Sequence, residues 1–243
     1  MPLDPGQIHL VVLTGAGISA DSGVRTFRDS GGLWEGHDVM QVATPAGWRA
    51  DPALVWRFYQ KRRAQLKEVE PNSAHQALFA MECTMNEMHQ AFTLISQNVD
   101  DLHQRCGSSV LDMHGQLSRL LCERCGMHID ERETCDPEQF IACPNCRFER
   151  MRPDVVWFGE MPHHMEEIEF AMRDCTHFLS IGTSGSVYPA AGLLAAARER
   201  GAQTTVNSLD EPENLEPADE FHAGRASEVI PALLEAWREG WFA

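Results

Sequence analysis

The sequence is poor in basic residues and has no long hydrophobic run, and each shortage excludes a class of protein. Its 243 residues hold 20 Lys and Arg against 36 Asp and Glu, a formal net charge of -16. This balance argues against a sequence-independent grip on nucleic-acid phosphates, which needs clustered cations. The apolar run Ile8–Leu13 is too short for a signal sequence or a membrane span, and Met1–Gly6 carries no basic side chain. We therefore expect a cytoplasmic protein with no membrane partner and no direct nucleic-acid partner.

The eight cysteines are not arranged as a disulfide framework, which argues for a reducing compartment. Four are scattered, and the others form the pairs Cys122-x-x-Cys125 and Cys143-x-x-Cys146. Two such pairs joined by a short ribbon are typical of one tetrahedral site, and four sulfur ligands favour zinc over magnesium or calcium. Because four thiolates leave no coordination position for water or substrate, this zinc is predicted to be structural. Catalysis is then expected elsewhere in the chain.

Short apolar runs alternate with stretches of helical character, the pattern of an α/β fold with a parallel sheet covered by helices. We predict a Rossmann-like, doubly wound sheet. The predicted strands are His9–Thr14, Phe92–Ser96, Val110–Met113, Val155–Trp157, His177–Ile181 and Gln203–Val206. The predicted helices are Ala53–Lys67, Ser73–His89, His163–Arg173, Ala190–Arg200 and Ser227–Arg238.

Two insertions interrupt the predicted Rossmann-like domain, which comprises residues 1–35, 72–116 and 153–243. Residues 36–71 lack strand signals but carry several large aromatic side chains, so they are predicted to form a helical insertion. Residues 117–152 are predicted to form the zinc ribbon. The two insertions together would make a small lobe with a cleft between it and the large domain. The acidic, proline-containing stretch Ser208–Glu220 is predicted to be a surface loop.

The first strand leads into the turn Gly15-Ala16-Gly17-Ile18-Ser19. A Gly-x-Gly turn after a strand lets the backbone approach a pyrophosphate, and the next helix would point its N-terminal amides at that charge. The third glycine of the dinucleotide motif is replaced by Ala20. On these residues alone, a tight turn without a ligand is as good an interpretation as a nucleotide site.

The continuation Ser22-Gly23-Val24-Arg25-Thr26-Phe27-Arg28 makes the pattern specific: with the glycine turn it resembles the opening of the sirtuin family of NAD-dependent protein deacylases. Further motifs of that family recur in the same order between Val11 and Ala226. They are Ser96-Gln97-Asn98-Val99-Asp100, His114-Gly115, the four paired cysteines, Val156-Trp157-Phe158-Gly159-Glu160 and Gly182-Thr183-Ser184.

The resemblance implies that NAD is consumed as a co-substrate and that one structural zinc is present. It also implies which residues bind NAD: Gly15, Ala16, Gly17, Ile18, Ser19, Phe27, Arg28, Gln97, Asn98, Val99, Asp100, Gly182, Thr183, Ser184, Asn207 and Ala226. Polar residues after a strand suit this task, because open α/β sheets bind ligands at the carboxyl ends of their strands. For Asn98 and Asp100, capping of the next helix is an alternative role. For the adenosine ribose, Asn214 is the alternative to Asn207.

The resemblance assigns catalysis to His114, as general base, and to Asn98 in the nicotinamide pocket. It implies that the acyl-lysine carbonyl oxygen displaces nicotinamide to give an alkylimidate. His114 then activates a ribose hydroxyl, and the acyl group leaves as O-acyl-ADP-ribose. An imidazole pKa near about 6.5 suits this proton transfer at neutral pH. From the residues alone, one histidine among 11 is more often a satisfied core or surface residue.

The expected partner is an acylated lysine side chain of a protein. Val156, Phe158 and Gly159 are predicted to bind the peptide as an added strand. Tyr59 and Arg62, three apart on a predicted helix, would lie on one face and offer a hydroxyl and a guanidinium to a carboxylate. That pair resembles the Tyr-x-x-Arg of class III sirtuins, including bacterial deacylases, which bind succinyl- or malonyl-lysine. Without the resemblance, the same spacing also fits packing of an amphipathic helix.

Three activities follow as hypotheses. The first is a deacylase that removes succinyl and malonyl groups, with acetyl as a further substrate. The second is an ADP-ribosyltransferase or NAD glycohydrolase on the same fold, for which Tyr59 and Arg62 have no obvious purpose. The third is a zinc-ribbon interaction module without catalysis, against which the ordered motifs and His114 argue. Nicotinamide and the deacylated product, followed together with an acylated peptide, separate them.

Overall fold

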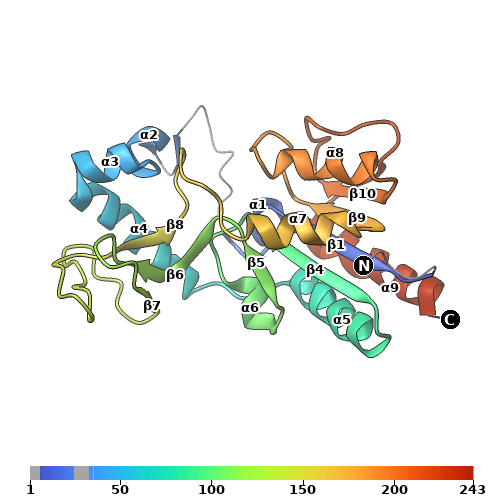
Figure 1. Cartoon of the computed structure of the whole chain (residues 1–243), viewed down its shortest axis with the longest axis horizontal. Coiled ribbons are helices and arrows are strands. Elements are labelled where there is room, and N and C mark those ends of the chain that lie inside the picture. Colours follow the sequence, from blue (N-terminus) through green and yellow to red (C-terminus); the bar gives the residue numbers. More distant parts are fainter. Residues whose placement is uncertain (1–5, 25–32, 35, 243) are drawn as a thin grey trace.

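A six-stranded sheet, with all neighbouring strands parallel, forms the core of the larger part of the molecule (right in Figure 1). The computed structural model describes residues 6–24, 33, 34 and 36–242, so the predicted NAD-binding residues Phe27 and Arg28 lie outside the described residues. The strand order is β11-β10-β9-β1-β4-β5. The strands are β1 (His9–Thr14), β4 (Ala91–Ser96), β5 (Val110–Asp112), β9 (His177–Ile181), β10 (Gln203–Ser208) and β11 (Glu220–Ala223). The predicted doubly wound α/β fold is confirmed.

The side of the sheet on which the chain adds new strands changes between β1 and β9. From β1 the chain adds β4 and β5 on one side, and it later adds β9, β10 and β11 on the other. In open α/β sheets, ligands bind outside the carboxyl ends of the strands at such a reversal. The topology therefore marks the ends of β1, β4 and β9 as the place to look for a site.

The strand β1 is buried on both of its faces, which explains its uninterrupted apolar sequence. Leu10 and Val12 belong to one hydrophobic cluster, and Val11 and Leu13 belong to another. This alternation is the period of two that places successive side chains on opposite faces of a sheet. The first cluster is covered by α5 (Ser73–Glu87) and α9 (Ala226–Phe242). The second is covered by α7 (Met165–Arg173) and α8 (Ala191–Glu199).

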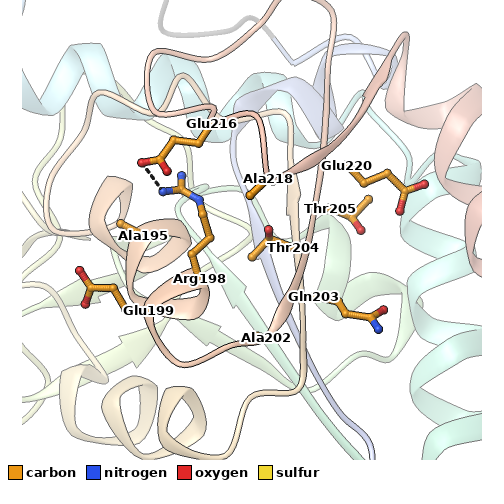
Figure 2. A pocket seen from close by; sticks show the side chains of 10 residues that line it. All are labelled: Ala195, Arg198, Glu199, Ala202, Gln203, Thr204, Thr205, Glu216, Ala218 and Glu220. Carbon is orange, nitrogen blue, oxygen red and sulfur yellow. Dashed lines mark ion pairs between the residues drawn. The ribbon is translucent and has the colours of Figure 1, made fainter.

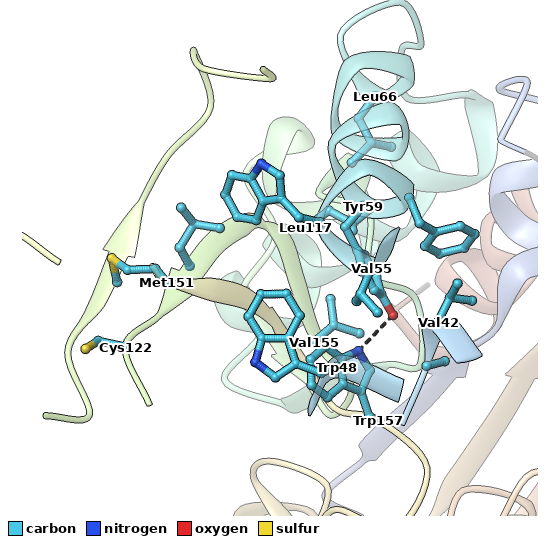
Figure 3. Packing of buried hydrophobic residues seen from close by; sticks show 14 of the residues in the cluster. Val42, Trp48, Val55, Tyr59, Leu66, Leu117, Cys122, Met151, Val155 and Trp157 are labelled. Carbon is cyan, nitrogen blue, oxygen red and sulfur yellow. Dashed lines mark hydrogen bonds between the residues drawn. The ribbon is translucent and has the colours of Figure 1, made fainter. Parts of the chain in front are cut away.

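A second unit, which we call the small lobe, lies beside the sheet (left in Figure 1). It consists of α2 (Val39–Val42), α3 (Pro45–Ala50), α4 (Pro52–Leu66) and a three-stranded antiparallel sheet in the order β7-β6-β8. The strands are β6 (Gly115–Leu121), β7 (His128–Asp130) and β8 (Arg152–Val155). Its core is rich in aromatic side chains (Figure 3): Trp48, Trp56, Phe58, Tyr59 and Trp157.

The helix α4, which carries two predicted substrate residues, begins at a strong N-terminal signal. The Asp51 side chain accepts a hydrogen bond from the Leu54 N–H, and Pro52 occupies the first helical position. The predicted helix Ala53–Lys67 therefore differs from α4 by one residue at each end. The other predicted helices agree to within two residues, except that α9 continues four residues further, to Phe242.

Three details of the predicted layout are wrong. Val155–Trp157 is not a strand of the large sheet: β8 ends at Val155 and pairs with β6 in the small lobe. Residues 36–71 are not free of strands, because β3 (His37–Asp38) pairs with β2 (Leu33–Trp34). The predicted loop Ser208–Glu220 includes the end of β10 and the start of β11. β11 is a half-exposed edge strand, so it lacks the apolar run that marks a buried one.

The division of the chain into domains stays a prediction. Two elements cross predicted boundaries. β6 begins at Gly115 and crosses the boundary between residues 116 and 117, and β8 begins at Arg152 and crosses the boundary between residues 152 and 153.

None of the described helices has both the length and the hydrophobicity of a membrane span.

Candidate active site

Most of the residues predicted to bind NAD follow the carboxyl ends of the parallel strands. Residues 97–100 come after β4, and residues 182–184 come after β9. The strand β1 lies between β4 and β9, and its last residue, Thr14, is level with the last residue of each neighbour. His114 follows β5 at the same edge, separated from the strand end by Met113. The sheet thus brings together groups that are far apart in the sequence.

The glycine turn after β1 contacts the turn after β9. The Gly17 N–H donates to the Gly182 carbonyl over 2.9 Å, and the Gly15 N–H donates to the Ile181 carbonyl over 2.9 Å. A Cβ atom on Gly17 would lie 2.6 Å from the Gly182 Cα, closer than real Cβ contacts come. The glycines are therefore required for contact between two turns. These two N–H groups already have partners, so approach to a pyrophosphate stays a prediction that depends on the remaining groups of the turns.

Asn98 and Asp100 are buried and connect β4 to the glycine turn. The Asn98 Nδ2 donates to the Gly15 carbonyl over 3.1 Å and to the Ser19 Oγ over 3.2 Å. The Asp100 Oδ1 accepts from the Leu102 N–H over 3.2 Å, at the start of α6 (Leu102–Cys106). Burial raises the pKa of Asp100 to about 6, against the lowering effect of its hydrogen bonds from Leu102 and Ser19. Asp100 thus contacts the first backbone N–H of α6 from the position before the N-cap, which is Asp101.

His114 has a fixed tautomer that suits a general base. Its Nδ1 lies 2.8 Å from the Gln97 carbonyl oxygen. A carbonyl only accepts hydrogen bonds, so Nδ1 carries the proton and Nε2 keeps its lone pair. Burial lowers the pKa of His114, with the bond to Gln97 opposing and the nearby His163 assisting. The imidazole is therefore mainly neutral at neutral pH, the form that can accept a proton.

Tyr59 and Arg62 are both buried in the small lobe, with 0% and 9% of their surfaces exposed. The Tyr59 hydroxyl accepts a hydrogen bond from the Trp157 Nε1 over 2.9 Å (Figure 3). The Arg62 Nη1 donates to the Phe58 carbonyl over 2.9 Å, and the guanidinium lies 3.9 Å from the centre of the Phe58 ring. Burial raises the pKa of Tyr59, so the phenol is neutral. The hydrogen bond from Trp157 and the positive charges of Arg152 and Arg62 act in the opposite direction.

The segment predicted to bind the peptide joins the two parts of the molecule. The Val156 N–H donates to the His114 carbonyl over 2.9 Å, and the Phe158 N–H donates to the Ala43 carbonyl over 3.0 Å. The Trp157 N–H donates to the Glu160 carboxylate over 2.8 Å. These three donors already have partners inside the protein. The predicted strand addition through Val156, Phe158 and Gly159 therefore cannot use these three N–H groups.

The two cysteine pairs meet at one point. The Cys122 and Cys146 sulfurs lie 3.6 Å apart, and so do those of Cys125 and Cys143. All four sulfurs lie within 4.8 Å of one another. Zinc–sulfur bonds of about 2.3 Å in a tetrahedron place sulfurs about 3.8 Å apart. The predicted ligand set therefore fits a structural zinc ion.

Comparison with known proteins identifies the family. The Sir2 family model matches residues 15–189. An NAD-dependent protein deacylase of Bdellovibrio bacteriovorus is 48% identical over 236 residues, which cover 95% of this chain and 97% of the relative. One of Pasteurella multocida is 44% identical over 232 residues, which cover 94% and 97%. The chain belongs to the Sir2 family. The resemblance to sirtuins drawn from its motifs is confirmed.

Solved Sir2 structures share the fold over nearly the whole chain. A complex of a Sir2 homologue with NAD has a TM-score of 0.85 at 33% identity and covers 96% of this chain and 90% of its own. Sir2Af2 bound to a myristoylated histone peptide has a TM-score of 0.72 at 29% identity, with coverage of 95% and 91%. These neighbours hold the two kinds of ligand that the motifs predict, a dinucleotide and an acylated peptide.

In this Sir2 chain, the two asparagines predicted as alternatives for the adenosine ribose each have a buried side-chain oxygen that could accept a hydrogen bond. The Asn207 Nδ2 donates to the His222 and Gly224 carbonyls over 2.9 and 3.1 Å, while its buried Oδ1 has no hydrogen-bond partner among the described residues. A buried acceptor without a partner is costly, and a ribose hydroxyl would satisfy it. The buried Oδ1 of Asn214 likewise has no partner in the described part of the chain, so the choice between Asn207 and Asn214 stays open.

A cavity of about 710 Å³ lies apart from these residues, between α8 and the start of β10 (Figure 2). None of the predicted site residues lines it. Arg198 projects into it, but its charge is matched by Glu216 at 2.6 Å and Asp219 at 2.9 Å. The cavity lies toward the amino ends of the strands, away from the edge where Sir2 chemistry is expected. Arg152 was not singled out from the sequence, and Trp157 and Glu160 were named only as members of the motif Val156–Glu160.

Proposed function

We propose that this protein is an NAD-dependent protein-lysine deacylase that prefers succinyl- and malonyl-lysine, with acetyl-lysine as a poorer substrate. The deacylase activity is supported by relatives named NAD-dependent protein deacylases that match almost the whole chain. The acyl preference is supported by one observation: a neutral phenol and a guanidinium, Tyr59 and Arg62, are buried together among aromatic rings.

Physical chemistry favours a carboxylate ligand for this pair. Charge-assisted hydrogen bonds to a guanidinium are about twice as strong as neutral ones, and a planar guanidinium can hold both oxygens of a carboxylate. Burial in an apolar cluster weakens competition from water, so an anion gains more there than at the surface. The single acyl charge of a succinyl or malonyl group would use both partners. An acetyl or myristoyl group carries no charge and would use neither.

The residues at the sheet edge would carry out the common chemistry. The His114 Nε2 would accept a proton from a ribose hydroxyl of NAD, while Gln97 holds the Nδ1 proton on the other side of the ring. Asn98 and Asp100 would bind the nicotinamide ribose end, since both are anchored to the glycine turn through Gly15 and Ser19. The products would be nicotinamide, the free lysine and O-acyl-ADP-ribose. Four thiolates would hold zinc away from the reaction, where it supports the small lobe.

The test is NAD-dependent turnover of matched succinyl-, malonyl- and acetyl-lysine peptides by the native protein and by Arg62→Met. We expect the native protein to favour the acidic acyl groups by at least about tenfold in kcat/KM, or about 1.4 kcal/mol. Arg62→Met should lose most of that preference, because Met fills the space without a charge. A native preference for acetyl, or equal losses on all peptides in the variant, would contradict the proposal.

A matched control lies on the same helix. Arg57 is part-exposed on α4 and pairs only loosely with Glu138, at 3.9 Å. Arg57→Met removes one positive charge from the same helix and should leave the ratio of succinyl to acetyl turnover unchanged. Release of nicotinamide without a deacylated product would instead indicate an ADP-ribosyltransferase or an NAD glycohydrolase.

A further inference from the structure

Trp157 makes three directed contacts within the core of the small lobe. The Arg152 guanidinium lies 3.6 Å from the centre of its ring. Its backbone N–H donates to the Glu160 Oε2 over 2.8 Å. Its indole N–H donates to the Tyr59 hydroxyl over 2.9 Å (Figure 3). With 2% of its surface exposed, the ring has no room to adopt another position without disturbing these contacts.

Arg152 is in turn fixed by Glu160 and by the backbone. Its Nη1 and Nη2 donate to the two Glu160 carboxylate oxygens over 2.6 and 2.8 Å, and Nη2 also donates to the Val155 carbonyl over 2.8 Å. A bidentate pair of this kind holds the guanidinium plane in one orientation. Because that plane lies over the indole, Glu160 and Arg152 together determine where the Trp157 ring sits.

The orientation of the Tyr59 hydroxyl follows from the chemistry of indole. An indole nitrogen only donates, so the phenol oxygen must accept from Trp157. The phenol proton is then directed away from Trp157. Without the indole N–H, the hydroxyl could rotate about its C–O bond and turn its proton into the space that the indole now occupies.

We propose that Trp157, fixed by Arg152 and Glu160, is a positioning residue that directs the Tyr59 hydroxyl toward the acid end of the acyl group. This inference rests on the proposed preference for succinyl and malonyl groups. It adds a determinant of specificity that lies behind the acyl-binding pair. Arg152 contributes to the preference through the Trp157 ring, as a partner that stacks on it and not as a second ligand for the acyl carboxylate.

A double-mutant cycle tests the proposal. Trp157→Phe keeps an aromatic ring beneath Arg152 and removes the indole N–H, and Tyr59→Phe removes the hydroxyl that it orients. The readout is the ratio of kcat/KM on succinyl peptide to that on acetyl peptide, in which losses common to both substrates cancel. We expect Trp157→Phe to lower this ratio by about threefold to tenfold, the range for one hydrogen bond. In the Tyr59→Phe background, the same substitution should not lower the ratio further.

The control is Trp56→Phe. Trp56 lies in the same aromatic cluster and donates its indole N–H to the Asp136 carbonyl over 3.0 Å, away from Tyr59. It should leave the ratio unchanged. If Trp157→Phe fails to fold, as judged by thermal melting and zinc content, Arg152→Lys provides the second route. Lysine keeps the charge but loses the stacked plane and the bidentate pair, so it should lower the ratio with Tyr59 present and not with Phe at that position.

The outcomes separate this inference from the proposed function. Equal falls in the ratio with and without the Tyr59 hydroxyl would overturn the positioning role, since Trp157 would then act independently. A high native ratio that neither Trp157→Phe nor Arg152→Lys alters would overturn it as well, and would leave the proposed function standing. A native ratio near one that Tyr59→Phe does not change would overturn both.

Discussion

The large sheet is covered by aliphatic side chains, whereas the core of the small lobe is made of aromatic rings and cysteines packed against buried arginines. Each face of the sheet has its own cluster of mainly Leu, Val, Ile, Met and Ala side chains. The core of the small lobe contains three tryptophans and two of the zinc-ligand cysteines, with Arg62 and Arg152 buried against its rings. Non-directional packing of alkyl groups is enough to support a sheet. Buried indoles and guanidinium groups need directed partners.

The two regions therefore contribute different things to the site. The sheet presents backbone turns and short polar side chains at one edge, such as Asn98, Asp100 and His114, which suit chemistry that is the same for every acyl group. The small lobe presents a rigid network of hydrogen bonds from Glu160 through Trp157 to Tyr59. Such a network suits discrimination between acyl groups, because discrimination depends on directed polar contacts. The predictions below test whether the two contributions can be separated.

Removal of zinc should have the largest effect, and it should fall on the small lobe. Cys143 is 1% exposed and packs in the same core as Trp48 and Trp157. Binding of a structural zinc ion is worth about 10–16 kcal/mol in isolated zinc-finger peptides. We expect Cys143→Ser, or treatment with a strong chelator, to destabilise the small lobe and abolish turnover while the large sheet remains folded. Melting followed by tryptophan fluorescence, to which Trp48, Trp56 and Trp157 of the small lobe contribute, should then occur at a lower temperature than melting followed by far-ultraviolet circular dichroism.

A thiol outside the site provides the control for that experiment. Cys106 is half-buried at the end of α6 and lies outside the four-sulfur cluster. Cys106→Ser should keep zinc and a single melting transition. If Cys143→Ser also melted in one transition with full zinc content, the small lobe would not depend on the metal for its structure.

His114→Ala should have the next largest effect, and it should be independent of the acyl group. A general base contributes about 100-fold to 10,000-fold to a rate, so kcat should fall by about that factor on succinyl, malonyl and acetyl peptides alike. The variant should keep its zinc and its melting temperature within a few degrees. His128→Ala is a suitable control, because His128 is exposed in the small lobe and bonded to Asp154. A fall confined to one acyl group would show that His114 belongs to the acyl site.

The pH dependence of the native enzyme provides a second measurement on His114. Because burial lowers the pKa of this imidazole below its ordinary value, the neutral form should persist to lower pH than for a histidine in water. The acidic limb of kcat/KM should therefore lie below about pH 6.5. It should disappear in the residual activity of His114→Ala.

The large sheet was more predictable from the sequence than the small lobe. His9–Thr14 and His177–Ile181 were predicted to the residue, because a run of apolar side chains buried on both faces has a clear start and end. The assignment of Val155–Trp157 to the large sheet was wrong, because three apolar residues fit a buried strand equally well in either sheet. Its true strand begins at Arg152, and only the packing of the small lobe explains why a buried arginine occurs there.

The site was predictable to the extent that it depends on short motifs. The motifs after β4, β5 and β9 fall at one edge because parallel strands end on the same side of a sheet. The reason for Gly17 was not predictable, because it depends on contact with Gly182 from a distant part of the chain. The role proposed for Trp157 was not predictable from the sequence either, because its partners Tyr59 and Arg152 come from two different elements.

The smallest predicted effect concerns the stability of the sheet edge. Burial raises the pKa of Asp100 from 3.8 to about 6, so between about pH 4 and 6 the folded protein binds more protons at this carboxyl than the unfolded chain does. Stability should therefore fall as the pH rises through that window. At about 1.4 kcal/mol for each pKa unit, the cost at neutral pH is at most about 3 kcal/mol.

Asp100→Asn keeps an oxygen acceptor for the Leu102 N–H and removes the charge. It should therefore raise the free energy of unfolding at pH 7 by up to that amount and by almost nothing near pH 4. Urea unfolding at the two pH values measures this, with the exposed Asp210→Asn as control. A gain in stability together with weaker NAD binding would mean that the sheet edge gives up stability to hold the ribose, whereas equal pH dependence in Asp100→Asn and native protein would mean that the buried carboxyl carries no such cost.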